Sequence, residues 1–194
     1  RLQGDWSSDV CSSDLACTMG AGALSLAPPL LRQAVMIETQ TGTPGSDKGW
    51  RVTAERLARL EVALAPEVLV AHEEAALARA LTGLDADLIL ILTASATSDI
   101  RDVAPAALVR AGGRVEHFGM PVDPGNLLFL GDLAGVPVVG LPGCARSPAL
   151  NGADWVLERL ICGVPVDAAA IRRMGVGGLL KEIPTRPRPR LRKD

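Results

Sequence analysis

Hydrophobic residues occur along this chain in short runs that alternate with helical patterns and turn residues. The most apolar run is residues 87–92, Asp-Leu-Ile-Leu-Ile-Leu. A near-continuous apolar run of this length indicates a strand buried on both faces of a parallel sheet. Four further strands are predicted, at residues 33–40, 67–71, 114–118 and 136–140, with a short hairpin arm within residues 126–133.

Helical patterns lie between these strands. Alternation of strands with helices predicts a three-layer α/β/α sandwich around a mostly parallel sheet. Start and stop signals place four helices. The first has Thr53 as its N-cap and Leu57, Leu60 and Leu64 on one face, and the second covers residues 73–81 and is ended by Gly83. The third is capped by Asp102 with Pro105 in its first turn, and the fourth has Ser147 as N-cap and Pro148 at N1 and runs to about Cys162.

Composition narrows the function classes. The chain has 194 residues, of which 48% are hydrophobic and 22% charged, as expected for a soluble domain with a substantial core. A net charge of -2, 3% aromatic residues and no Tyr argue against nucleic acid as a partner. No apolar run is long enough for a membrane span. Four cysteines without metal-ligand spacing predict a reducing, cytoplasmic location.

The two ends differ from the middle of the chain. Residues 5–15 resemble the in-frame translation of a common sequencing adapter, so residues 1–15 are expected to be an artefact on a metagenomic fragment, and residues 16–32 the remnant of a truncated upstream element. The main domain is expected at residues 33–165, with an extension at 166–183. Residues 184–194 alternate Pro and Arg, which predicts a linker to a missing domain, or alternatively a basic arm.

Hydroxyl side chains and a carboxylate follow the central strand. Thr93, Ser95, Thr97 and Ser98 precede Asp99 and a predicted helix. Hydroxyls and backbone N–H groups before a helix suit phosphate oxygens, and a carboxylate suits a magnesium ion carried by a nucleotide. The alternative is a strand-to-helix turn in which these side chains cap locally.

A second loop contains Pro124 and Gly125, and Gly125 permits close backbone approach or a positive φ. Its alternative role is an ordinary rigid turn. Two lone histidines, His72 and His117, are expected to cap or pack rather than to bind metal. Cys144 has no obvious His partner and is not expected to be a nucleophile.

A third loop follows the last predicted strand. Gly140, Pro142 and Gly143 form a turn that leads to Arg146 and Ser147 at the predicted helix start. Backbone N–H groups at such a turn form a concave anion site, and Arg146 adds a cation. Because strands of one direction end at the same edge of the sheet, all three loops are candidates for one site.

Taken together, these loops resemble the molybdopterin-binding domain of molybdenum-cofactor biosynthesis enzymes, a MoaB/Mog-like family. That family has a Gly-Gly-x-Ser-x-Gly-Asp loop, a Pro-Gly loop and a Gly-Leu-Pro-Gly turn in this order. The resemblance covers about residues 33–163. Residues 112–126, 143–148 and 174–184 look like a bacterial subfamily in which this domain precedes a molybdenum-cofactor nucleotidyltransferase domain.

The resemblance implies a phosphorylated pterin as ligand: molybdopterin or its adenylylated form, with Mg²⁺ and ATP or another nucleotide. It assigns Asp99 to magnesium and catalysis. This chain departs from the family, since Thr93, Ala94 and Ser98 stand where the family has glycines. Family lysines near the Pro-Gly loop are Asp123 and Asn126 here, a loss for which Arg146 compensates.

The leading hypothesis is therefore a molybdopterin-binding domain, with Mg-dependent nucleotidyl or molybdate transfer if it is an enzyme. One alternative is a non-catalytic module that presents the ligand to a fused nucleotidyltransferase. Another is a CinA-like nucleotide pyrophosphatase, and a last one is a degenerate fragment. Relatives of this fold commonly form dimers or trimers, so a homo-oligomer is expected.

Overall fold

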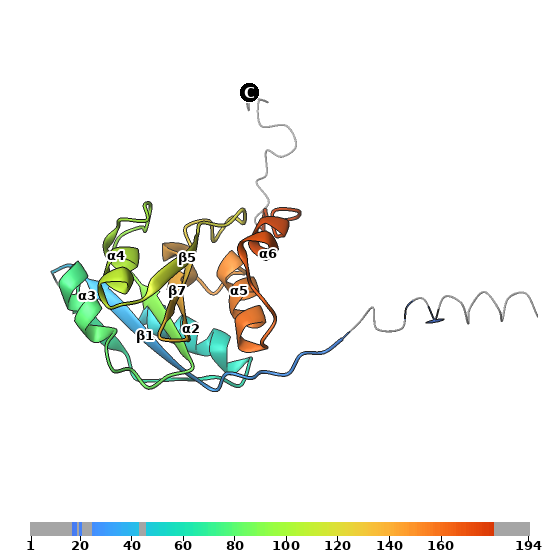
Figure 1. Ribbon diagram of the computed structural model, residues 1–194, viewed down its shortest axis with the longest axis horizontal. Helices are drawn as coiled ribbons and strands as arrows, with labels where there is room; N and C mark the ends of the chain where they lie inside the picture. Colours follow the sequence, from blue (N-terminus) through green and yellow to red (C-terminus); the bar gives the residue numbers. More distant parts are fainter. Residues whose placement is uncertain (1–16, 19, 21–24, 43–45, 181–194) are drawn as a thin grey trace, which may run out of the picture.

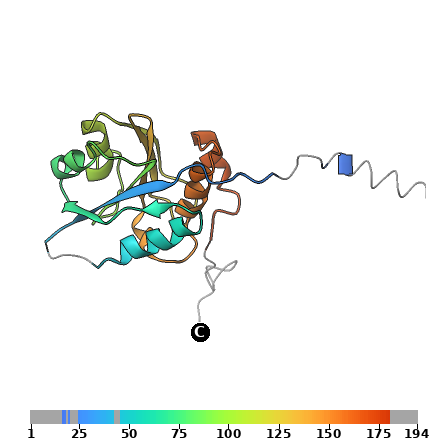
Figure 2. The ribbon, with the colours of Figure 1, turned by 90° about the horizontal axis from the view of Figure 1, so that it is seen from below.

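A computed structural model describes residues 17–18, 20, 25–42 and 46–180 (Figures 1 and 2). The adapter-like segment and the Pro/Arg segment of the sequence lie outside the described residues. A seven-stranded sheet forms the middle layer, in the order β2-β1-β4-β7-β6-β5, with β3 also pairing with β1. The strands are β1 (Gln33–Gln40), β2 (Ala63–Leu64), β3 (Val68–Ala71), β4 (Leu88–Leu92), β5 (Arg114–Phe118), β6 (Phe129–Leu133) and β7 (Val136–Leu141).

β1 pairs in parallel with β2, β3 and β4, and β4 pairs in parallel with β7. β6 alone among these strands runs the other way, since it pairs antiparallel with both β5 and β7. The central position of β4 explains its apolar sequence, because all five of its residues are buried. The mostly parallel sheet predicted from the sequence is confirmed.

Helices cover both faces of the sheet, which completes the three layers. One core cluster packs one sheet face against residues of α2, α5 and α6. The second packs the opposite face against α3 and α4, which lie together on one side in Figure 1. The helices are α2 (Lys48–Ala58), α3 (Glu74–Ala80), α4 (Val103–Arg110), α5 (Gly152–Ile161) and α6 (Ala168–Arg173), with a 3-10 turn η1 (Gly143–Arg146). No helix in the described ranges has the length and apolar character needed to cross a bilayer.

The predicted helix start at Ser147 and Pro148 is wrong. Both residues lie in an exposed, non-helical segment between η1 and α5. The helix is capped instead by Asn151, whose side chain accepts the Ala153 N–H at 3.0 Å while Asp154 accepts the Asn151 N–H at 2.8 Å. This reciprocal box satisfies two orphan N–H groups, which a Ser-Pro start would not do.

The start of α2 also differs from the prediction. Thr53 is buried inside this helix rather than capping it, and the helix ends at Ala58. Leu60 therefore follows the helix, and Leu64 belongs to β2. The periodic leucines lie on the core side as expected, but the short parallel pairing of β2 with β1 overrides the helical period.

Candidate functional site

The carboxyl ends of β1 and β4, together with the amino-terminal half of β3, border a cavity of about 490 Å³. In an open parallel sheet, this edge is where ligands bind. Two cations, Lys48 and Arg146, line the cavity together with two carboxylates, Glu38 and Glu67. The remaining lining residues are Thr39, Gln40, Thr41, Ser46, Leu69 and Ala94.

Arg146 joins two of the loops singled out from the sequence. Its Nη2 donates to Glu38 Oε1 at 2.6 Å and to the Thr93 carbonyl at 3.1 Å. The third loop thereby meets the first one at the end of β4. The side chain of Glu38 is 10% exposed and that of Arg146 is 31% exposed. Nη2 is committed to these acceptors, whereas Nε and Nη1 make no hydrogen bond within the described part of the chain, so their N–H groups remain available as single donors to an anion.

The hydroxyl loop after β4 is held by its own side chains. Thr93 Oγ1 donates to the Ser95 carbonyl at 2.7 Å and lies 3.2 Å from Thr97 Oγ1, and both threonines are buried. The N–H groups of Ser98 and Asp99 both donate to Asp102 Oδ2, at 2.6 and 3.0 Å. Asp102 holds the N-cap position of α4, but its side chain satisfies the preceding loop and makes no cap bond to the helix. A phosphate at these N–H groups would have to displace that carboxylate.

Asp99 is exposed in the turn that precedes α4, and its Oδ1 accepts the Arg101 N–H at 2.8 Å. The described residues contain no cluster of three His, Cys, Asp or Glu side chains placed to hold a metal. Mg²⁺ in nucleotide sites is held by one or two carboxylates plus phosphate oxygens. The second oxygen of Asp99 therefore fits a magnesium ion only if the ligand's phosphates supply the rest of its coordination.

The Pro124–Gly125 loop packs against the start of α5. Gly152 donates its N–H to the Pro124 carbonyl at 2.8 Å, and a Cβ at Gly125 would lie 2.7 Å from the Gly152 nitrogen. Gly125 also has φ +134, so two independent constraints require glycine here. Asn151 Nδ2 contacts Cys144 Sγ at 3.1 Å, which links this region to the Gly143 turn. The second and third loops are thus neighbours.

The glycines of the third loop have different roles. A Cβ at Gly140 would lie 1.9 Å from the Phe129 ring, its cross-strand partner on β6, so Gly140 makes room for an aromatic side chain in the core. Gly143 is exposed, with nothing near the position of a Cβ, and follows the buried Pro142 that precedes η1. Of these glycines, Gly143 alone offers its backbone to solvent.

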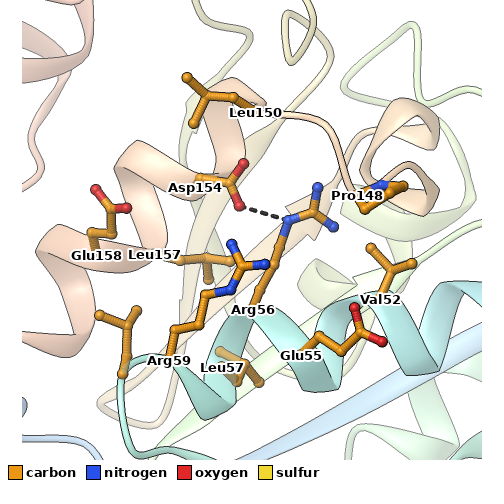
Figure 3. A pocket seen from close by; sticks show the side chains of 11 residues that line it. Val52, Glu55, Arg56, Leu57, Arg59, Pro148, Leu150, Asp154, Leu157 and Glu158 are labelled. Atoms are coloured by element: carbon orange, nitrogen blue, oxygen red, sulfur yellow. Dashed lines mark hydrogen bonds and ion pairs between the residues drawn. The ribbon is translucent and has the colours of Figure 1, made fainter.

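Arg56, on α2, holds the third loop in place, and the sequence reasoning missed it. Its guanidinium donates to the carbonyls of Ala145, Ser147 and Ala149, and its Nε donates to Asp154 Oδ1 at 2.6 Å. Figure 3 shows this pair between α2 and α5, beside a cavity of about 160 Å³. The Arg56–Asp154 pair thus joins α2 to α5 at this smaller cavity, and its polar groups are committed to partners within the fold.

A second missed feature is a chain of hydrogen bonds beside the larger cavity. His72 Nδ1 lies 2.8 Å from Thr39 Oγ1, and His72 Nε2 lies 2.9 Å from Ser95 Oγ. Thr39 Oγ1 also accepts the Ala94 N–H at 2.9 Å. The sequence predicted only that His72 caps or packs, and it did not predict these hydrogen bonds, because residues 39, 72 and 95 are distant in sequence.

Carboxylates lie close enough at this edge to influence one another. Burial raises the pKa of the Glu67 carboxyl, and the charges of Glu38 and Asp47 raise it further. Lys48 and Arg146 oppose this negative field within the same cavity. The cavity thus carries mixed charge, with cations at defined positions rather than a uniformly positive surface.

No family model matches the chain, and no curated protein matches it significantly. Among solved structures, the molybdopterin biosynthesis MoeA protein from Pyrococcus horikosii is 17% identical, with a TM-score of 0.47 over 73% of this chain and 36% of its own length. Molybdenum cofactor biosynthesis protein B is 16% identical, with a TM-score of 0.48 over 71% of this chain and 97% of its own length. This chain therefore spans about a third of the MoeA protein. At these identities and TM-scores the two likenesses assign no residue roles.

Proposed function

We propose that this chain binds a phosphorylated pterin, molybdopterin or its adenylylated form, at the carboxyl edge of its sheet, and that it acts in molybdenum-cofactor biosynthesis. The observation that carries the proposal is the meeting of two candidate loops at Arg146, which bonds the Thr93 carbonyl beside a cavity of about 490 Å³. A cavity of that size suits a ligand of this class. The proposal that the ligand is a pterin rests on the order of the loop motifs in the sequence.

In this proposal the ligand's phosphate lies against Lys48 and the unbonded Nε–H or Nη1–H group of Arg146. We propose that the hydroxyls of Ser95 and Ser98 and the backbone of Gly143 complete the site. Guanidinium and ammonium groups form the stronger, charge-assisted bonds to phosphate oxygens. Glu38 fixes the direction of Arg146 through the 2.6 Å bond, so little side-chain freedom is lost when a ligand binds.

Asp99 is proposed as the residue that contacts Mg²⁺ carried on a nucleotide's phosphates. The metal would supply charge neutralisation at a transferring phosphoryl group. This chain's own contribution is to orient the phosphates through Arg146 and Lys48. Under the same proposal, Thr97, Pro124, Pro142 and Ser147 shape the loops and do not touch reacting atoms.

A non-catalytic presenting module is the second candidate. It is favoured by the carboxylate of Asp102, which occupies the N–H groups of Ser98 and Asp99 where the first loop would bind phosphate. Binding through two cations without that N–H site is sufficient to hold a ligand, but it supplies fewer donors to a transferring group.

Calorimetry with molybdopterin tests the proposal. Lys48→Ala and the double variant Glu38→Gln/Arg146→Gln are each expected to weaken binding by about tenfold or more, because a charge-assisted hydrogen bond contributes about 1.5–3 kcal/mol. The double variant leaves no unpaired buried charge, so it avoids the folding loss expected for Arg146→Ala. Arg79→Ala, on the exposed side of α3, is the matched control and keeps full affinity.

Asp99→Ala is measured with MgATP as well as with molybdopterin. Loss of the magnesium dependence of nucleotide binding supports the assignment of Asp99. Unchanged binding in both the Asp99 variant and the Arg146 double variant would contradict the assignment of the ligand site to this edge of the sheet. Ligand binding without any consumption of ATP would favour the presenting module over the transferase.

A further inference from the structure

We infer that His72 is a positioning residue that turns the hydroxyl hydrogen of Ser95 toward the ligand. His72 follows β3 and lies between Thr39 Oγ1 at 2.8 Å and Ser95 Oγ at 2.9 Å. Thr39 lines the larger cavity, as does Ala94, the neighbour of Ser95. The nature of the ligand rests on the proposed function, whereas the direction of the hydrogen bonds rests only on these contacts.

The direction follows from the hydroxyl of Thr39. Its oxygen already accepts the Ala94 N–H at 2.9 Å, and the residue is 2% exposed. A buried hydroxyl hydrogen needs an acceptor, and the acceptor that the contacts of Thr39 offer is His72 Nδ1. Nδ1 must then carry a lone pair, which places the ring proton of the neutral imidazole on Nε2.

Ser95 consequently receives a hydrogen bond from His72 rather than donating one. With its oxygen occupied by Nε2–H, the exposed Ser95 hydroxyl keeps its own hydrogen for an outside acceptor. Hydrogen bonds aligned in one direction polarise one another, so the chain from Ala94 N–H through Thr39 and His72 strengthens Ser95 as a donor. An oxyanion such as a phosphate oxygen is the acceptor that gains most from such a donor.

The same geometry distinguishes this role from nucleophilic catalysis. A serine nucleophile requires a histidine lone pair to accept its proton. The direction inferred here leaves no lone pair on Nε2, so no covalent step at Ser95 follows from the pairing. Thr39 and His72 act through Ser95, and of these three residues Ser95 is the one proposed to touch the ligand.

The first experiment reads the tautomer in the full chain by NMR with ¹⁵N-labelled histidine, at about pH 8.5, where imidazole side chains are neutral. The expected result is a protonated Nε2 and an unprotonated Nδ1 for His72, with His117→Gln used to assign the signals. In Thr39→Val this preference is expected to disappear. A protonated Nδ1 in the wild-type chain overturns the inference. Because no ligand is present, this outcome is independent of the proposed function.

The second experiment measures binding of inorganic phosphate to His72→Gln and His72→Phe. A glutamine amide can accept from Thr39 and donate to Ser95, so it is expected to keep affinity within about twofold, whereas phenylalanine should weaken binding by about fivefold to tenfold. The loss should vanish when the phenylalanine variant is made in a Ser95→Ala background. Equal affinities for the two His72 variants, a loss that persists without the Ser95 hydroxyl, or no phosphate binding by the wild type would each overturn the positioning role. If phosphate binds as expected but molybdopterin does not bind, that result would instead count against the proposed function.

Discussion

Removing the Arg56 side chain is expected to destabilise this fold strongly. Arg56 is 9% exposed, and its partner Asp154 is 15% exposed, so both charges are largely withdrawn from water. The guanidinium also satisfies the carbonyls of Ala145, Ser147 and Ala149, between η1 and α5. Truncation to alanine leaves a buried carboxylate and three carbonyls without their donor.

The magnitude follows from the buried pair. Losing one partner of a buried, hydrogen-bonded ion pair costs about 3–5 kcal/mol. For a chain of this size, that loss corresponds to a fall in melting temperature of roughly 6–20 °C. Arg56→Lys keeps the charge but cannot reach four acceptors with one nitrogen, so it should recover only part of the loss.

Urea denaturation measures the free energy of unfolding of the wild type, Arg56→Ala, Asp154→Asn and the double variant. Asp154 also accepts the Asn151 N–H of the α5 cap, so its variant has an additional cost of its own. Exposed Arg79→Ala serves as the control and should change stability by less than about 0.5 kcal/mol. A loss below about 1 kcal/mol for Arg56→Ala, or strictly additive single and double variants, would refute the reasoning that this pair joins α2 to the third loop.

Three further variants test the packing and the charge of the sheet edge. Gly140→Ala would place a methyl group 1.9 Å from the Phe129 ring and should destabilise the fold by about 3 kcal/mol. Gly143→Ala, with open space around it, should leave the urea midpoint nearly unchanged. Equal effects of the two substitutions would contradict the packing account. Glu67 has a pKa raised above its usual value of 4.5 by burial and by Glu38 and Asp47, so the wild type loses stability as pH rises through that raised pKa. Glu67→Gln should therefore melt higher than wild type at neutral pH and equally below about pH 4, and a difference that grows toward acid would refute this sign.

Local patterns determined much of the fold. The bounds of β1 and β5 were predicted to the residue. β1 contains a short apolar run with branched side chains, and β5 alternates polar and apolar residues between the turn glycines Gly113 and Gly119. The burial of β4 followed from a run that has no polar face to give to solvent. The order of strands and helices then required a layered sheet with helices on both faces, because each apolar helix stripe must be covered.

Only the tertiary structure decided how the candidate site is built. Ser147 looked like a helix start by sequence, yet Arg56 binds its carbonyl from another helix, and Asn151 caps α5 instead. Hydrogen bonds connect Thr39 to His72, which are 33 positions apart in the sequence, and His72 to Ser95, which are 23 positions apart. No local sequence pattern encodes such contacts. Sequence periodicity reports which face of an element is apolar, whereas hydrogen bonds between loops depend on which strand ends lie side by side, and that is set by the packing of the whole sheet.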